Sequence, residues 1–172
     1  MSRSPTFQRR HVYGAIAAGA LALAALVPLS ADAAQAVARF DGGIGESPVS
    51  TVLATGLATP NTVNGIGPGG QPWVISSLHA SVDDGGNVRA DGRGLLLAGG
   101  NGIGTNGAQS VKVIFFCNGV RSDSGAAGVP LEANGDFRID DQLTPVPIGP
   151  CNTSTLLITN VGNRWFAAGI PK

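Results

Sequence analysis

Short runs of alternating apolar and polar residues, separated by turn residues, constrain the fold of this chain more than any other feature. In residues 77–82 the apolar side chains share one parity and the polar side chains the other: Leu78, Ala80 and Val82 against Ser77, His79 and Ser81. Successive side chains of a strand point to opposite faces of a sheet. The pattern therefore predicts a strand with one buried and one solvated face.

Turn residues predict where these strands are connected. Residues 83–87, with the sequence Asp-Asp-Gly-Gly-Asn, predict a hairpin into residues 88–90. Asn134-Gly135-Asp136 predicts a second hairpin between residues 129–131 and 137–140, because Asn-Gly favours the positive φ angles of a tight turn. Residues 155–159 and 164–168 are expected to form a third pair.

The fold class follows from these short strands. Residues 111–117 are apolar on both parities, which predicts a strand at the centre of the sheet. The three prolines within residues 144–150 predict an exposed connection that leads to Cys151. No segment after residue 33 has a sustained helical period. We therefore predict an all-β antiparallel β-sandwich, with a small β-barrel as the alternative, preceded by a signal-peptide helix.

The first 33 residues predict export. Arg3, Arg9 and Arg10 precede an apolar run over residues 12–29, and small residues follow at 31–33. This order of basic, apolar and small-residue segments is typical of a signal peptide, cleaved here before Ala34. A membrane anchor is the alternative reading, but the run is mostly Ala and Gly and contains Pro28. The paired arginines also resemble a twin-arginine signal, although the general secretory route is favoured.

Residues 34–172 have the composition of a single folded domain with many turns. Roughly 140 residues are enough to bury one core. Eight basic and ten acidic residues remain after the leader is removed. The balance provides no positive field for a nucleic acid or for anionic lipid, so we expect neither a nucleic-acid partner nor membrane association after cleavage.

The two cysteines, Cys117 and Cys151, are expected to form a disulfide, because an exported protein folds in an oxidising compartment. Closing a loop of this length stabilises a fold by roughly 3 to 4 kcal/mol in the chain-entropy model. A reactive thiol or a zinc pair is the alternative, but the cysteines lack CxxC spacing and a four-ligand set.

Three motif matches carry little weight. Residues 65–70 and 102–107 both fit GxGxxG, but apolar strand-like segments follow them, and nucleotide binding through this motif requires the glycine loop to open a helix. The acidic turn with Asp83, Asp84, Asn87 and Asp91 lacks the spacing of a calcium-binding loop. We therefore expect no cofactor and no metal.

His79 is the only histidine after residue 33 and the one candidate for catalysis. Ser77 and Ser81 share its strand face, but such neighbours lie about 7 Å apart, too far for a serine–histidine hydrogen bond. A solvated strand residue is the simpler reading of His79, so we assign no catalytic residue.

Four segments of the chain resemble an uncharacterised group of exported bacterial proteins: residues 72–75, 92–100, 135–139 and 165–172. This resemblance implies export and a single domain. It implies no activity, substrate or catalytic residue.

The function expected from the sequence is that of an exported, non-enzymatic β-domain with a binding or structural role. Its partner, extracellular or periplasmic, is unknown. Trp73, Trp165 and His79 are the candidate ligand-binding residues. One alternative is a carbohydrate-binding module, in which exposed tryptophan rings would stack on sugars. The other is a small secreted hydrolase that uses His79.

Overall fold

The computed structural model describes residues 34–52 and 54–172, which belong to one compact unit. The predicted signal peptide, residues 1–33, lies outside the described residues. Every regular element of the described part is a strand, so the all-β prediction is confirmed. The strands are β1 (Ala36–Gly45), β2 (Val49–Thr51), β3 (Ala58–Pro60), β4 (Trp73–Val74), β5 (Ser77–Asp83), β6 (Asn87–Arg93), β7 (Leu96–Leu97), β8 (Ser110–Cys117), β9 (Val120–Asp123), β10 (Val129–Pro130), β11 (Phe137–Gln142), β12 (Ser154–Asn160) and β13 (Trp165–Pro171).

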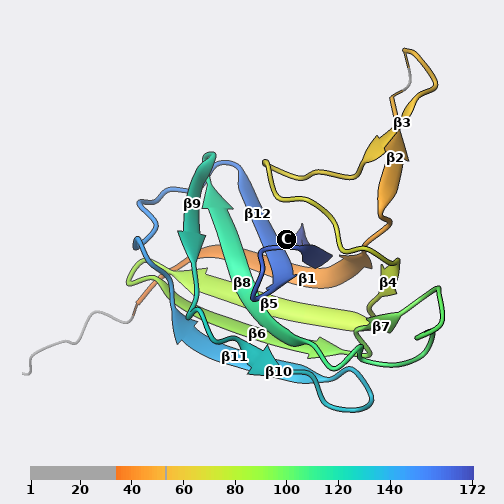
Figure 1. The fold of residues 1–172 in the computed structure, drawn as a ribbon. Helices are drawn as coiled ribbons and strands as arrows, with labels where there is room; N and C mark the ends of the chain where they lie inside the picture. Colours follow the sequence, from red (N-terminus) through yellow and green to blue (C-terminus); the bar gives the residue numbers. More distant parts are fainter. Residues whose placement is uncertain (1–33, 53) are drawn as a thin grey trace, which may run out of the picture. The chain divides into compact units, whose positions relative to one another are not determined.

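Nine strands form one antiparallel sheet that curls into a half-barrel (Figure 1). The order is β10-β8-β12-β13-β1-β5-β6-β11, and β9 also pairs with β8. Reciprocal backbone hydrogen bonds between Asp123 and Thr144, with N···O distances of 2.9 and 2.8 Å, join the end of β9 to the segment after β11. These bonds bring the two edges of the curled sheet together at one end.

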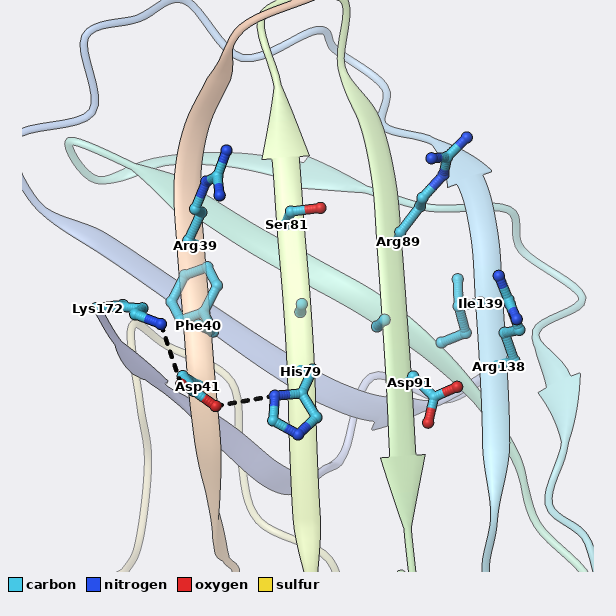
Figure 2. A pocket seen from close by; sticks show the side chains of 12 residues that line it. Arg39, Phe40, Asp41, His79, Ser81, Arg89, Asp91, Arg138, Ile139 and Lys172 are labelled. Atoms are coloured by element: carbon cyan, nitrogen blue, oxygen red, sulfur yellow. Dashed lines mark hydrogen bonds and ion pairs between the residues drawn. The ribbon is translucent and has the colours of Figure 1, made fainter.

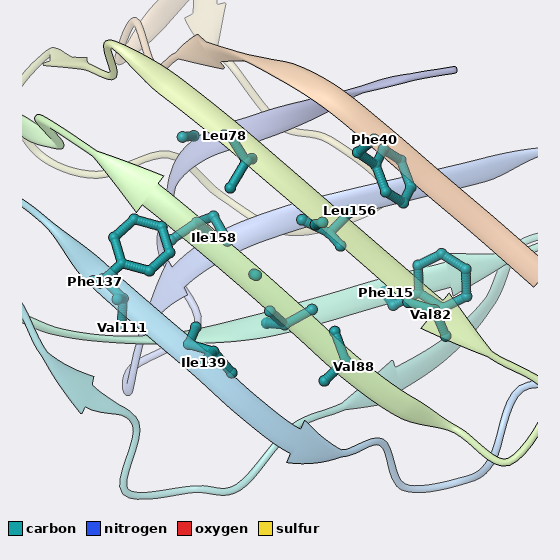
Figure 3. Packing of buried hydrophobic residues seen from close by; sticks show 14 of the residues in the cluster. Phe40, Leu78, Val82, Val88, Val111, Phe115, Phe137, Ile139, Leu156 and Ile158 are labelled. Atoms are coloured by element: carbon teal, nitrogen blue, oxygen red, sulfur yellow. The ribbon is translucent and has the colours of Figure 1, made fainter. Parts of the chain in front are cut away.

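Side chains of β1, β5, β6 and β11 alternate between the two sides of the curled sheet. The polar set faces outward (Figure 2), and the apolar set packs inside against β8 and β12 (Figure 3). These four strands are bent around the larger of two hydrophobic clusters, so one set of side chains is removed from water while the other stays solvated. The main core residues are Phe40, Leu78, Val82, Val88, Val111, Phe115, Phe137, Ile139, Leu156 and Ile158.

Three strand predictions are confirmed. β5 and β6 form the hairpin across residues 83–87, and β12 pairs with β13. β8 is buried from Val111 to Cys117 and has neighbours along both edges, with β12 on one edge and β9 and β10 on the other. Its apolar residues on both parities reflect burial on both faces.

The predicted hairpin between residues 129–131 and 137–140 is wrong. The turn itself is present, and Gly135 has a φ of +81°. However, β10 pairs with β8, and β11 pairs with β6 in a register that matches Phe137 to Gly92. The loop between β10 and β11 instead bonds to other parts of the chain. Leu131 N–H donates to Gln109 O, and Gly135 O accepts from Leu95 N–H, both at 2.9 Å.

The predicted disulfide between Cys117 and Cys151 is confirmed, with a Cα–Cα distance of 5.0 Å. It joins the end of β8 to the start of the segment that leads into β12. Residues 144–150 contain no named strand, as their prolines predict. The covalent link therefore anchors this irregular connection to the most buried strand.

Two short ribbons lie outside the large sheet. β4 pairs with β7, and β2 pairs with β3. The β2–β3 ribbon projects from the half-barrel (Figure 1) and exposes Val49, Val52 and Leu57.

Candidate functional site

The most distinctive surface of the described residues is the outer side of β1, β5, β6 and β11, which we call the polar face. It is hollowed, and a depression of about 340 Å³ spans its four strands. Its side chains project from four adjacent strands toward solvent (Figure 2). The residues of the polar face are Arg39, Asp41, His79, Ser81, Arg89, Asp91, Arg138 and Asp140, with Lys172 at its margin.

Strand register aligns these side chains in two rows across the sheet. The first, which we call the His79 row, contains Asp41, His79, Asp91 and Arg138. The second, which we call the Ser81 row, contains Arg39, Ser81, Arg89 and Asp140. Directly opposed side chains on neighbouring strands lie close enough to interact, so each row forms one continuous polar track.

The two carboxylates of the His79 row, those of Asp41 and Asp91, are already ion-paired within the protein. Asp41 accepts from His79 Nδ1 at 2.8 Å and from Lys172 Nζ at 3.3 Å. Asp91 is 3.0 Å from Arg93 Nε, and Arg93 also reaches Asp136 at 3.0 Å. The hydrogen bond from Arg93, with a further one from a backbone N–H, holds the pKa of Asp136 below its ordinary value. These acids are therefore already bound to cations of the protein.

Two residues of the Ser81 row have donors without a partner among the described residues. Arg89 Nε is 3.4 Å from Asp140, and both side chains are more than half exposed. Within residues 34–52 and 54–172, no ion pair or hydrogen bond involves the guanidinium of Arg39 or the hydroxyl of Ser81. A second hollow of about 480 Å³ meets the first at Arg39, Ser81 and Arg89.

His79 lies on the polar face with two-thirds of its side chain exposed. Asp41 orients its imidazole through Nδ1, which leaves Nε2 directed to solvent (Figure 2). In the described part of the chain no serine hydroxyl forms a hydrogen bond with His79, in agreement with the separation expected along one strand face. An aspartate–histidine pair is present, but no serine of residues 34–52 or 54–172 is hydrogen-bonded to it.

The two tryptophans are structural. Trp73 is 5% exposed and stacks on Phe166, with ring centroids 4.1 Å apart. Trp165 is 4% exposed and donates its indole N–H to Asn61 O at 2.8 Å. Of the three candidate ligand-binding residues, the structure therefore places His79 on the surface and both tryptophans in the protein interior.

In two other clusters, around Asp83 and around Asp123, the carboxylates are bonded to neighbouring side chains of the same cluster. The carboxylate of Asp83 accepts hydrogen bonds from the backbone and side chain of Asn87, at 2.8 and 2.9 Å. Burial raises the pKa of Asp123, but hydrogen bonds from Arg121 outweigh this effect and hold the pKa below its ordinary value. Lys112 lies 3.5 Å from the same carboxylate. Neither cluster presents a free group comparable to Arg39.

The sequence analysis missed most of the polar face. Arg39 and Asp41 alternate with Ala38 and Phe40, which is the same period of two that predicted β5. This local signal was available for β1. The alignment of the rows was not, because it depends on strand register.

Comparison of the chain with protein-family models, with curated proteins and with solved structures finds no match. Within residues 34–52 and 54–172, no helix has the length and apolar character needed to cross a membrane. The case for a function therefore rests on the geometry and charge of the polar face.

Proposed function

We propose that this protein is an exported, non-enzymatic binding domain that contacts its ligand or partner through the polar face. The observation that carries this proposal is the hollow over the two polar rows, where the donors of Arg39 and Ser81 have no partner among the described residues. Binding sites in proteins are typically concave, with a few converging polar groups. The ligand would supply the hydrogen-bond acceptors that Arg39 and Ser81 lack among the described residues.

Export is supported by two independent features. The leader has the order of segments expected of a signal peptide, and the disulfide between Cys117 and Cys151 is compatible with an oxidising compartment. We place the mature protein, residues 34–172, outside the cell or in the periplasm. Intact-mass spectrometry of the exported protein tests this placement. The expected species begins near Ala34, whereas a full-length species retained in the membrane fraction would contradict export.

A hydrolase is the second candidate, and the Asp41–His79 pair is the observation that favours it. In such an enzyme His79 would act as a general base on water or on a substrate hydroxyl. The absence of a serine bound to His79 in the described residues favours binding over catalysis. Assays on ester, peptide and glycoside substrates decide between the two: turnover that disappears in His79→Ala would establish the hydrolase.

A carbohydrate-binding module remains compatible with the proposal only if sugars bind through polar contacts. Stacking on tryptophan requires an exposed ring face, and both tryptophan side chains are buried. Sugar hydroxyls would then have to contact the charged rows of the polar face.

A ligand screen tests the proposal directly. Soluble glycans, peptides and small anions are screened by ligand-observed NMR against the exported protein and two variants. Arg39→Glu reverses a charge on the polar face, and Arg164→Glu makes the same change in the connection before β13. We expect ligands to lose binding to Arg39→Glu and to retain it with Arg164→Glu. The reverse result would move the binding surface away from the polar face.

A further inference from the structure

We propose that Arg39, Ser81 and Arg89 form a seat for a tetrahedral oxyanion, a phosphate or sulfate group that is free or esterified. This inference rests on the proposed function, because the seat lies on the polar face. It goes further by naming the chemical class of the ligand and the side chains that hold it.

The register of three strands provides the geometry. Arg39 of β1 pairs with Ser81 of β5, which in turn pairs with Arg89 of β6. Adjacent strands are about 4.8 Å apart, so the two arginine Cα atoms lie roughly 10 Å apart with the serine between them. Both long side chains rise from the same side of the sheet (Figure 2). The Arg89 side chain leans toward β11, where it pairs with Asp140, and rotation about its side-chain bonds brings its guanidinium toward an anion above Ser81.

The hollowing of the surface supports the same position. Among the described residues, Arg39, Ser81 and Arg89 alone line both the 340 Å³ hollow and the 480 Å³ hollow. The two depressions therefore meet where the donor-bearing side chains of Arg39, Ser81 and Arg89 stand on neighbouring strands. A bound group at this position leaves room on both sides for the rest of a larger ligand.

Competition from the protein's own acids is weak at this position. Asp41 is held by His79 and Lys172, and Asp83 is hydrogen-bonded to Asn87, although it also attracts Arg89. Asp140 contacts Arg89, but at 3.4 Å and with both side chains largely exposed. Such exposed pairs contribute little to stability, so an incoming anion can replace Asp140 as the partner of Arg89.

The donor set identifies the ligand class. Two guanidinium groups provide planar pairs of N–H donors, and Ser81 adds a hydroxyl donor. A phosphate or sulfate group presents three or four oxygens in different directions. This arrangement matches two guanidinium groups on either side of the anion and a serine hydroxyl beneath it. A carboxylate presents only two oxygens, in one plane, so it offers fewer acceptor directions to donors that are not coplanar. We therefore expect phosphate and sulfate to bind more tightly than acetate.

The test is a titration of the exported protein followed by ³¹P NMR at constant ionic strength. Inorganic phosphate is the first probe, and inorganic sulfate and acetate are added as competitors. We expect sulfate to displace phosphate at lower concentration than acetate does. Equal competition by acetate, or no binding of phosphate, would overturn the proposal.

Four variants locate the binding site. Arg39→Gln is expected to weaken phosphate binding about tenfold, because a charge-assisted hydrogen bond is lost. Asp140→Asn is expected to strengthen it, since Arg89 loses its competing partner. Arg164→Gln, which removes a charge outside the polar face, should leave the Kd unchanged. If Arg138→Gln weakens binding as much as Arg39→Gln, attraction is diffuse and the seat does not exist.

Two further probes distinguish the source of the anion. Glucose 6-phosphate tests a sugar ester, and vesicles of phosphatidylglycerol in phosphatidylcholine test a lipid headgroup. Binding of the sugar ester alone assigns the seat to phosphorylated or sulfated sugars, and binding of vesicles assigns it to a lipid surface. If other ligands bind the polar face but no phosphate or sulfate compound does, the seat is wrong while the proposed function stands.

Discussion

Trp73 of β4 and Phe166 of β13 stack with their ring planes 18° apart and their centroids at 4.1 Å. This contact fastens the small β4–β7 ribbon to the large sheet. Stacking of two buried aromatic rings adds to the stabilisation that comes from removing their surface from water. Trp73 is therefore a structural anchor of the half-barrel.

Replacement of Trp73 should affect stability and leave the polar face intact. Trp73→Ala removes a large buried side chain, for which a loss of about 3 to 5 kcal/mol is expected. Val74→Ala is the matched control, because the neighbouring Val74 is 50% exposed. Urea unfolding monitored by circular dichroism measures the free energy of unfolding of both variants. Equal stability of the two variants would contradict the structural role of Trp73.

The disulfide should stabilise the fold without creating it. Replacing Cys117 and Cys151 with alanine removes a link across 34 residues of sequence. The free energy of unfolding is expected to fall by roughly 2 to 4 kcal/mol, while the native spectrum is retained. Thiol titration of the unmodified protein provides the control: two free thiols in the native state would show that the link does not form in the exported protein.

Gly92 should tolerate no side chain. A Cβ at this position would collide with the ring of Phe137, its partner in the register of β6 and β11. Gly92→Ala is expected to lower the free energy of unfolding by about 1 to 3 kcal/mol. Gly70→Ala is the control, because a Cβ there meets open space. Thermal unfolding of the two variants compares them, and a wild-type Tm for Gly92→Ala would contradict this packing.

Glu46 should make stability depend on pH. Its side chain is buried, and its carboxylate oxygens have no hydrogen-bond partner among the described residues. Burial raises its pKa from 4.5 to about 7. The folded protein therefore holds this proton more tightly than the unfolded chain does. The contribution of Glu46 to the free energy of unfolding should fall by roughly 3 kcal/mol as the pH rises from about 4.5 to 7.

Glu46→Gln isolates this effect, because glutamine has a similar shape and does not ionise. The free energy of unfolding of this variant should not show the decline between pH 4.5 and 7. The variant should therefore be more stable than the unmodified protein above pH 7. Glu132→Gln changes an exposed glutamate and should keep the wild-type profile. Urea unfolding between pH 4 and 8 measures all three proteins. Parallel profiles for Glu46→Gln and the unmodified protein would show that Glu46 does not titrate in this range.

Side-chain parity predicted much of the fold because burial is a local property of a strand. Leu78, Ala80 and Val82 had to face the core wherever β5 paired. Parity does not identify the partner strand, and for this reason the hairpin predicted across Gly135 was wrong although its turn exists. The position of β11 beside β6 depends on how the whole sheet curls.

The polar face could be predicted only in part for the same reason. That His79 lies on a solvated face followed from the pattern of β5. Its contact with Asp41 depends on the register of β1 against β5, to which no local sequence signal points. The hypothesis that Trp73 or Trp165 contacts a ligand rested on residue type alone, and burial of both side chains removes its physical basis.

Amide chemical-shift mapping tests the central claim most directly. A ligand found in the screen is titrated into the ¹⁵N-labelled exported protein, and shift changes are mapped on the structure. The account predicts that the changes cluster on the outward residues of β1, β5, β6 and β11, with Ser81 among the largest. Changes confined to another surface, such as the exposed apolar side chains of the β2–β3 ribbon, would contradict it.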